Sequence, residues 1–204
     1  IPASLICGYL REVHWISRHS FFSIIPPVRA RVPNEFLKEY QGYIQTDAYS
    51  GYDALGRRPG IYHVGCWAHA RRKFMEVVKA GSGKGKKGHA ETVLESIGRL
   101  YTVEESARKE ELTPDQIAQL RQQKSKPILD DLALRLNALQ SQTPPKGLLG
   151  KAVNYTLKNW PLLFRYLENG WITPDNNATE NAIRPFVVDR KNWLFSGHPT
   201  GARA

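Results

Sequence analysis

The sequence has few cysteines and no long hydrophobic run. Cys7 and Cys66 are the two cysteines among 204 residues. They are too few for a disulfide scaffold, which favours a reducing compartment. The apolar runs are short and are interrupted by charged residues or Pro, so no membrane-spanning segment is predicted. Residues 1–10 lack the basic region of a signal peptide. We therefore expect a cytoplasmic protein without a membrane partner.

Methionine is also scarce. Its one occurrence is Met75, and the chain begins with Ile1, so we expect a fragment or a processed chain. Hydrophobic residues make up 41% of the sequence and charged residues 24%. This composition is typical of a globular protein and excludes a disordered chain. The length suits one domain that contains an inserted subdomain.

Basic residues outnumber acidic ones. There are 29 Lys and Arg against 19 Asp and Glu, and the net charge is +10, which indicates a polyanionic partner. More than half of the excess lies in residues 66–88, which contain seven basic residues and one acidic residue. The Gly/Lys loop at 81–88 suits either a solvated linker or a mobile loop that contacts phosphates. It lacks the glycine spacing of a nucleotide-binding P-loop.

Hydrophobic periodicity predicts an α/β domain with a helical insertion. Short strands are expected at 42–46 and 61–64. A helix is expected at 66–79, where Trp67, Ala70 and Phe74 recur at helical spacing. Thr113, followed by Pro114 and Gln116, has the pattern of a helix N-terminus. Further helices are expected around 93–101, from 114 to about 140, and at 148–158 and 161–168.

Two acidic residues are candidate metal ligands. Asp47 follows the first of these strands, and a carboxylate at a strand end suits a divalent cation. An Asp in this position also commonly caps the following turn. Glu180 lies in the polar segment 173–185, where Asn177 and Glu180 have the spacing of a capping box. If Glu180 faces Asp47 from the first turn of a helix, the two carboxylates would form an oxygen-ligand Mg²⁺ site.

Two further motifs suit binding. Cys66 and His69 have the spacing of half a zinc site, but zinc would need His63 or distant ligands, because no second cysteine pair lies nearby. A structural cysteine and a histidine that faces DNA or a carboxylate are therefore favoured over zinc. The segment 189–197 combines basic, amide and aromatic side chains, which suits contacts with a nucleic-acid backbone and base stacking. A core strand with solvated basic residues explains the same pattern.

Four sequence blocks together resemble the insertion-sequence sixty-six family of bacterial transposases. The blocks are GYIQTDAYSGY at 42–52, GCWAHARRKF at 65–74, DNNATENAIRP at 175–185 and RKNWLFSG at 190–197. Their order and separation are similar as well, and a long helical insertion lies between the second and third blocks. The resemblance extends over about residues 30–204.

This resemblance implies a ribonuclease-H-like fold with a mixed sheet and an Asp-Asp-Glu active site that binds two Mg²⁺ ions. Asp47 would be the second acidic residue and Glu180 the third, each both catalytic and a metal ligand. The implied partner is DNA, as transposon ends and target, in the bacterial cytoplasm at the nucleoid; a homo-oligomer is left open. Cys66 would be structural or lie near the DNA. The residues expected to contact DNA are His69, Arg71, Arg72, Lys73, Lys84, Lys86, Lys87, Arg184, Arg190, Lys191, Asn192 and Trp193.

Residues 1–28 depart from the family pattern. The family's first catalytic Asp lies on a strand upstream of the Asp47 strand, but residues 1–28 contain no Asp, and Glu12 is their one acidic residue. We expect residues 1–28 to come from a shifted reading frame or a disrupted gene. Residues 29–80 and 147–204 would form the core, the latter with the Glu180 helix, and 81–146 the helical insertion.

The sequence thus predicts a truncated transposase domain. With two of three carboxylates, it would bind metal weakly and would not catalyse transposition alone. The alternative is a non-catalytic basic DNA-binding protein on the same fold.

Overall fold

The computed structural model describes residues 21–23, 37, 40–48, 52–81 and 88–177. The chain divides into two compact units, one formed by 15–175 and the other by 1–14 with 176–204. The described elements belong to the first unit. In chain order they are β1 (Phe21–Ser23), β2 (Gly42–Gln45), α3 (Asp53–Gly56), β3 (Ile61–Val64), α4 (Trp67–Ala80), α5 (His89–Lys109), α6 (Pro114–Leu120), η2 (Arg121–Ser125), α7 (Lys126–Gln142), α8 (Leu148–Lys158), α9 (Trp160–Phe164) and η3 (Arg165–Glu168).

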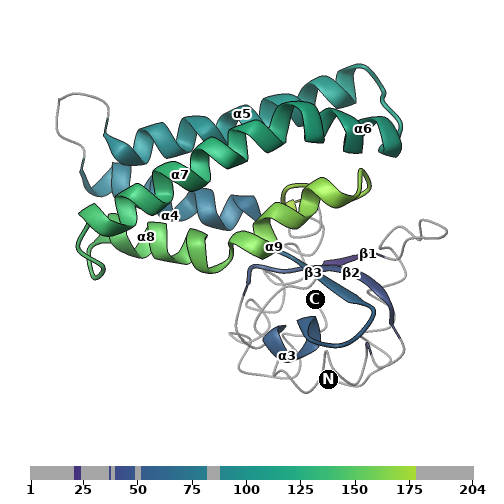
Figure 1. Cartoon of the computed structure of the whole chain (residues 1–204), viewed down its shortest axis with the longest axis horizontal. Coiled ribbons are helices and arrows are strands. Elements are labelled where there is room, and N and C mark those ends of the chain that lie inside the picture. The colour runs from purple at the N-terminus through teal and green to yellow at the C-terminus, as the bar shows by residue number, and fades with distance from the viewer. Residues whose placement is uncertain (1–20, 24–36, 38–39, 49–51, 82–87, 178–204) are drawn as a thin grey trace, which may run out of the picture. The chain divides into compact units, whose positions relative to one another are not determined.

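The sheet has the strand order β1-β2-β3 (Figure 1). Both strand pairs are parallel, with Phe22 opposite Ile44 and Tyr43 opposite Tyr62. The strands predicted at 42–46 and 61–64 are confirmed, and so is an α/β architecture. The described strands form a parallel sheet, however, whereas a mixed sheet was expected. β1 lies within the segment 1–28, and its sequence, Phe-Phe-Ser, contains no acidic residue.

Four helices form a closed bundle beside the sheet. α4 contacts α5 and α8, and α7 also contacts α5 and α8, so each helix packs against two others. Figure 1 shows these four helices side by side. The predicted helical insertion therefore packs against helices on both sides of it in the sequence. Within the described residues, no helix is both long and apolar enough to cross a membrane.

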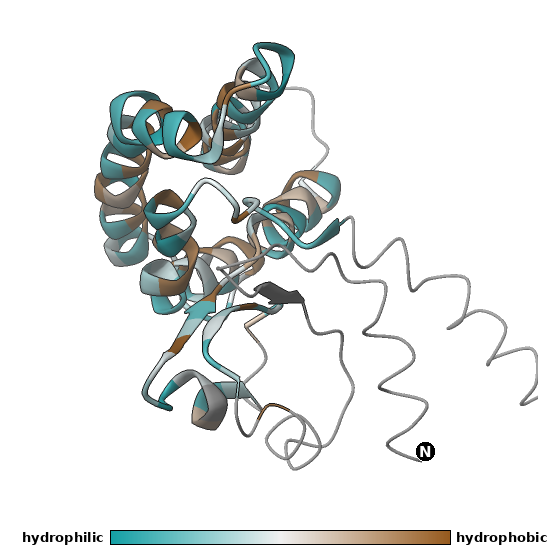
Figure 2. Ribbon diagram, turned by 90° about the vertical axis from the view of Figure 1, so that its right-hand side faces the viewer, coloured by the Kyte–Doolittle hydropathy of each residue, from teal (hydrophilic) through white to brown (hydrophobic). Residues whose placement is uncertain are grey.

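The bundle core is apolar and continuous. Figure 2 shows hydrophobic and hydrophilic residues recurring around each helix, as amphipathic packing requires. Trp67 is fully buried, its Nε1 donates to the Leu163 carbonyl at 3.0 Å, and its ring meets Trp160 edge-on. On α7, Leu129, Leu132, Leu136 and Leu139 recur at helical spacing and are all buried. Each such leucine contributes about 1.5–3 kcal/mol through burial.

The helix expected from 114 to about 140 is interrupted. Its N-terminus is confirmed as a capping box, in which the Gln116 amide donates to Thr113 Oγ1 and the Thr113 amide donates to the Gln116 side chain. A π-helical stretch at η2 separates α6 from α7. Pro127 has no amide hydrogen and its ring excludes the carbonyl four residues earlier, so a wider turn before it relieves the clash. Residues 121–126 contain no apolar side chain, so apolar spacing carries no information about the break.

Arg121, in the π-helical stretch, is a buried cation with all its donors used. Its Nε and Nη2 form a bidentate pair with Glu104 at 2.8 and 2.6 Å. Nη1 donates to the Tyr166 and Asn169 carbonyls, and Nη2 also donates to that of Ile172, at 2.8–2.9 Å. These bonds account for the five N–H groups of a guanidinium. Arg121 therefore fixes the backbone of 166–172 to α5.

His63 is a buried histidine on β3, 4% exposed. Its Nε2 lies 2.8 Å from Thr46 Oγ1, which also accepts a hydrogen bond from the Ala48 amide. Burial lowers the pKa of His63 below 6.5, and the positive charge of Arg165 acts in the same direction. The negative charges of Asp53 and Asp47 oppose this shift. The folded protein therefore favours neutral His63.

We expect Arg121→Met to lower the free energy of unfolding by about 3–5 kcal/mol, because it leaves Glu104 and three backbone carbonyls without their partner. Urea denaturation measures the change. Arg135→Met is the matched control, since Arg135 pairs with Asp131 on an exposed surface of α7, where a pair contributes about 0–1 kcal/mol. Equal losses in the two variants would contradict a special role for the buried cation.

We expect the free energy of unfolding to fall as the pH is lowered from about 7 to 5. In the unfolded chain, His63 takes up a proton near pH 6.5. In the folded chain, His63 takes up its proton only at a lower pH, because its pKa is lowered. The loss from this residue is at most about 1.4 kcal/mol for each pH unit. Urea denaturation across this range should show a shallower pH dependence in His63→Gln, whereas His89→Gln serves as control. An unchanged slope in His63→Gln would refute this assignment.

Candidate functional site

Asp47 and Cys66 follow neighbouring parallel strands. Because parallel strands end at the same edge of a sheet, residues 46–48 after β2 and 65–66 after β3 lie together. The Thr46 amide donates to the Val64 carbonyl at 3.0 Å, which extends the pairing past β2. We call residues 45–48 and 64–67, with the segment 173–175 described next, the carboxyl edge of the sheet.

The segment 173–175 returns to this edge from the far end of the chain. The Pro174 carbonyl accepts from the amide of Trp67, the first residue of α4, at 2.9 Å. Gln45 Nε2 donates to the carbonyls of Thr173 and Gly65 at 2.9 and 3.2 Å. The fully buried Gln45 side chain thus joins three parts of the chain. This contact places the beginning of the polar segment 173–185 beside the strand that carries Asp47.

Asp47 is half-buried in a tight turn. Ala48 has a φ of 59°, in the left-handed region that few residues other than glycine adopt. Its amide donates to Thr46 Oγ1 at 3.0 Å, so Thr46 rather than Asp47 supplies this turn's side-chain acceptor. The Asp47 carbonyl accepts from the Tyr155 hydroxyl of α8 at 2.8 Å. Burial, followed by the negative charge of Asp47, raises the pKa of Tyr155.

A second tyrosine contacts the returning segment. The hydroxyl of Tyr101 on α5 donates to Asp175 Oδ2 at 2.7 Å. Burial is the main cause that raises the pKa of Tyr101, and the hydrogen bond to Asp175 adds to it. Both phenols therefore remain protonated donors at neutral pH. The helices α5 and α8 thus each donate one half-buried hydrogen bond to a different part of the carboxyl edge.

The basic residues predicted on α4 have different surroundings. Arg71 and Arg72 are exposed. Lys73 is half-buried, and its ammonium lies 4.5 Å from the centre of the Tyr155 ring, a cation–π contact. His69 is half-buried in the first turn of α4. Cys66 is 1% exposed at the N-cap position. Of the basic residues predicted as DNA contacts on α4, Arg71 and Arg72 are thus the exposed ones.

Several predicted site residues lie outside the described part of the chain. These are Glu180, Lys84, Lys86, Lys87, Arg184, Arg190, Lys191, Asn192 and Trp193. Asn177, predicted as a helix cap, is assigned to a helix and is the last described residue. Within residues 21–23, 37, 40–48, 52–81 and 88–177, no three His, Cys, Asp or Glu side chains group closely enough to hold a metal ion.

Sequence reasoning missed the residues that shape this edge. Tyr155 lies 108 residues from Asp47 and Gln45 lies 128 residues from Thr173. No local pattern marks either pair. Tyr155 and Tyr101 look like ordinary amphipathic residues of their helices. The density of polar residues at 173–185 was the one sequence signal, and it indicated the segment that contains Asp175 but not the partner of Asp175.

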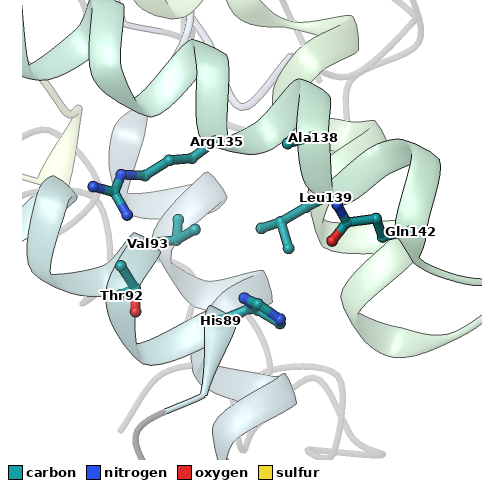
Figure 3. Close-up of a pocket in the computed structure, with 7 residues that line it drawn as sticks. All are labelled: His89, Thr92, Val93, Arg135, Ala138, Leu139 and Gln142. Atoms are coloured by element: carbon teal, nitrogen blue, oxygen red, sulfur yellow. The ribbon is translucent and has the colours of Figure 1, made fainter.

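A separate small groove lies between α5 and α7. It has a volume of about 170 Å³ and is lined by His89, Thr92, Val93, Arg135, Ala138, Leu139 and Gln142. Figure 3 shows these side chains coming from the first turn of α5 and the second half of α7. None of them is a predicted site residue. The groove is therefore distinct from the residues that the sequence singled out.

Comparison with known proteins identifies the family. The model described as "Transposase IS66 family" matches residues 17–204, which include part of the segment 1–28. Two similar proteins are uncharacterized proteins of Sinorhizobium fredii. One, y4jD, is 32% identical over 179 residues, covering 84% of this chain and 34% of the relative. The other, y4hP, is 30% identical over 184 residues, covering 85% and 33%.

The chain spans about a third of the length of these curated relatives. No solved structure matches it. The family model, by contrast, covers nearly all of the chain, including the carboxyl edge with Asp47, Cys66 and Asp175. The chain belongs to the IS66 family of transposases.

Proposed function

We propose that this chain is part of the catalytic domain of an Asp-Asp-Glu transposase, which cleaves and joins DNA strands with the help of Mg²⁺. One observation carries the proposal. The segment 173–175, which leads towards Glu180, is hydrogen-bonded to the strand end that presents Asp47. Asp175, the last residue of that segment, comes five positions before Glu180 in the sequence. Family membership supports the same assignment.

The available ligand chemistry fits a hard divalent cation. Asp47 offers carboxylate oxygens from a half-buried turn at a strand end, and oxygen ligands are those that Mg²⁺ prefers. Glu180 would add the second carboxylate. A metal pair held by these carboxylates would supply activation of the attacking hydroxyl and stabilisation of the leaving oxygen. The chain's own contribution is to fix the carboxylates and to bind the backbone phosphates through Arg71 and Arg72.

The order of strands supports a ribonuclease-H-like core as part of this proposal. Three parallel strands carry the acidic residue at the end of the middle one, and a helix follows the third directly. Asp47 is the first Asp of the sequence. Of an Asp-Asp-Glu set, this chain therefore supplies two members. We expect weak metal binding and no strand transfer by these 204 residues alone. Action on DNA at the bacterial nucleoid, with or without self-association, belongs to the same proposal.

The metal-binding part is tested by Mn²⁺ titration of the purified chain. Electron paramagnetic resonance measures free Mn²⁺, a common substitute for Mg²⁺. We expect Asp47→Asn and Glu180→Gln each to weaken binding at least about tenfold, because each removes a ligand. Asp130→Asn is the control, since Asp130 pairs with Lys126 on an exposed surface of α7. Unchanged binding in Asp47→Asn would overturn the proposed metal site. Strand transfer by the unmodified chain would overturn the expectation that these 204 residues are inactive alone.

A second function, DNA binding without catalysis, is favoured by the exposed Arg71 and Arg72 within the most basic segment. We expect Arg71→Ala/Arg72→Ala to weaken binding to duplex DNA and to lower the slope of log affinity against log salt by about 2, because two phosphate contacts are lost. The control variant Arg108→Ala/Lys109→Ala removes the same charge from an exposed part of α5. Fluorescence anisotropy at several salt concentrations measures the DNA affinity of both double variants, and equal salt slopes in the two would refute a specific role for α4.

The same assay separates the two functions. Binding that survives Asp47→Asn and Glu180→Gln, with no Mg²⁺-dependent nicking under any condition, favours the DNA-binding protein. Nicking that is supported by Mg²⁺ and abolished by both substitutions favours the catalytic domain. The two roles share the α4 surface but differ in whether the carboxylates matter.

A further inference from the structure

Tyr155 is placed to control the geometry of Asp47. It lies on α8, and its hydroxyl donates to the Asp47 carbonyl at 2.8 Å. Among the hydrogen bonds of the described residues, this one joins α8 directly to the Asp47 turn. The neighbouring residues of α8, Val153 and Thr156, are fully buried. Tyr155 is therefore held on a rigid element, whereas Asp47 lies in a turn.

The turn needs such a contact. Ala48 adopts a left-handed conformation, which is unfavourable for a residue with a Cβ atom. Two hydrogen bonds oppose its relaxation. The Ala48 amide donates to Thr46 Oγ1, and the Tyr155 hydroxyl donates to the carbonyl of Asp47, which lies between these two residues in the sequence. The allowed rotamers of a side chain depend on its backbone torsions, so a hydrogen bond that fixes ψ of Asp47 also restricts the direction of its carboxylate.

The phenol is itself fixed in place. The Lys73 ammonium of α4 lies over its ring at 4.5 Å. Burial, with the nearby Asp47 and Cys66, raises the pKa of Tyr155, and Arg72 lowers it in part. The hydroxyl therefore remains protonated at neutral pH and can donate this hydrogen bond. Tyr155 thus contacts both Lys73 on α4 and the turn that contains Asp47.

We propose that Tyr155 is a positioning residue that sets the direction of the Asp47 carboxylate through its hydrogen bond to the Asp47 carbonyl. The inference rests on the proposed function, in which Asp47 binds a divalent cation. Tyr155 itself contacts the backbone and supplies no ligand. Its effect on metal affinity therefore passes through Asp47, and it disappears when the Asp47 ligand is absent.

The test uses the full chain and Mn²⁺ alone. Tyr155→Phe keeps the ring and its contact with Lys73 but removes the hydroxyl. We expect it to weaken Mn²⁺ binding about tenfold, as loss of an orienting partner does in metal sites. Tyr40→Phe is the matched control, because the Tyr40 hydroxyl also donates to a backbone carbonyl, that of Tyr43, at 2.9 Å. We expect this control to bind Mn²⁺ within about twofold of the unmodified chain.

A double-mutant cycle separates positioning from a general loss of structure. In the Asp47→Asn background, we expect Tyr155→Phe to change Mn²⁺ affinity by less than about twofold. The backbone ¹³C and ¹⁵N shifts of Asp47 and Ala48 should move in Tyr155→Phe and stay in place in Tyr40→Phe. All titrations are run at a temperature at which circular dichroism shows each variant folded.

The outcomes distinguish the inference from the proposed function. If Asp47→Asn leaves Mn²⁺ affinity unchanged, the metal site fails and the inference fails with it. If Asp47→Asn weakens binding but Tyr155→Phe does not, the metal site stands and the role of Tyr155 is overturned. A loss from Tyr155→Phe that persists in the Asp47→Asn background also overturns it. If Tyr155→Phe does not fold, Thr46→Val and Thr46→Ser test the turn instead, with Mn²⁺ titrations that follow the backbone shifts of Asp47 in each variant and in the unmodified protein. Thr46→Ser should keep both the shifts and the Mn²⁺ affinity of the unmodified protein. An equal Mn²⁺ affinity in Thr46→Val would overturn the inference.

Discussion

The buried guanidinium of Arg121 determines where the last described part of the chain runs. It pairs with Glu104 on α5 and donates to the carbonyls of Tyr166, Asn169 and Ile172. A charge this deeply buried is tolerated when each of its donors has a partner. Directly after Ile172, residues 173–175 form hydrogen bonds to Gln45, Trp67 and Tyr101. The route from the helical bundle to the carboxyl edge of the sheet thus depends on one cation.

The helical bundle and the sheet have different roles at the carboxyl edge of the sheet. The strands present Asp47 and Cys66 at neighbouring ends, which follows from parallel pairing. The bundle supplies the hydrogen-bond donors that fix the backbone there, Tyr155 from α8 and Tyr101 from α5. The helices inserted between the second and third sequence blocks therefore do more than separate these two blocks in the sequence. They fix the segments that carry acidic residues, while α4 keeps Arg71 and Arg72 exposed.

Much of the secondary structure could be predicted because its causes are local. Apolar spacing placed β3 and α8 at their observed bounds, and the capping box at Thr113 marked the start of α6. The break at η2 was missed, because residues 121–126 are all polar and give no apolar spacing to follow. Pro127, moreover, acts on the turn before it. Lys73 was expected at a DNA surface, and the structure also gives it a contact with Tyr155. Charge alone does not indicate which basic side chain packs against a ring.

The sequence by itself determined the family, through four ordered blocks, and it determined the positions of most described strands and helices and of the candidate carboxylates Asp47 and Glu180. These are properties of short segments, where periodicity and residue type act over a few neighbours. Only the tertiary structure decided that Gln45 meets Thr173, that Tyr155 meets Asp47 and that Arg121 binds three carbonyls of a distant loop. Such partners depend on how helices and strands pack. A hydrogen-bond donor requires an acceptor within about 3 Å, and packing alone brings together residues that are so far apart in the sequence.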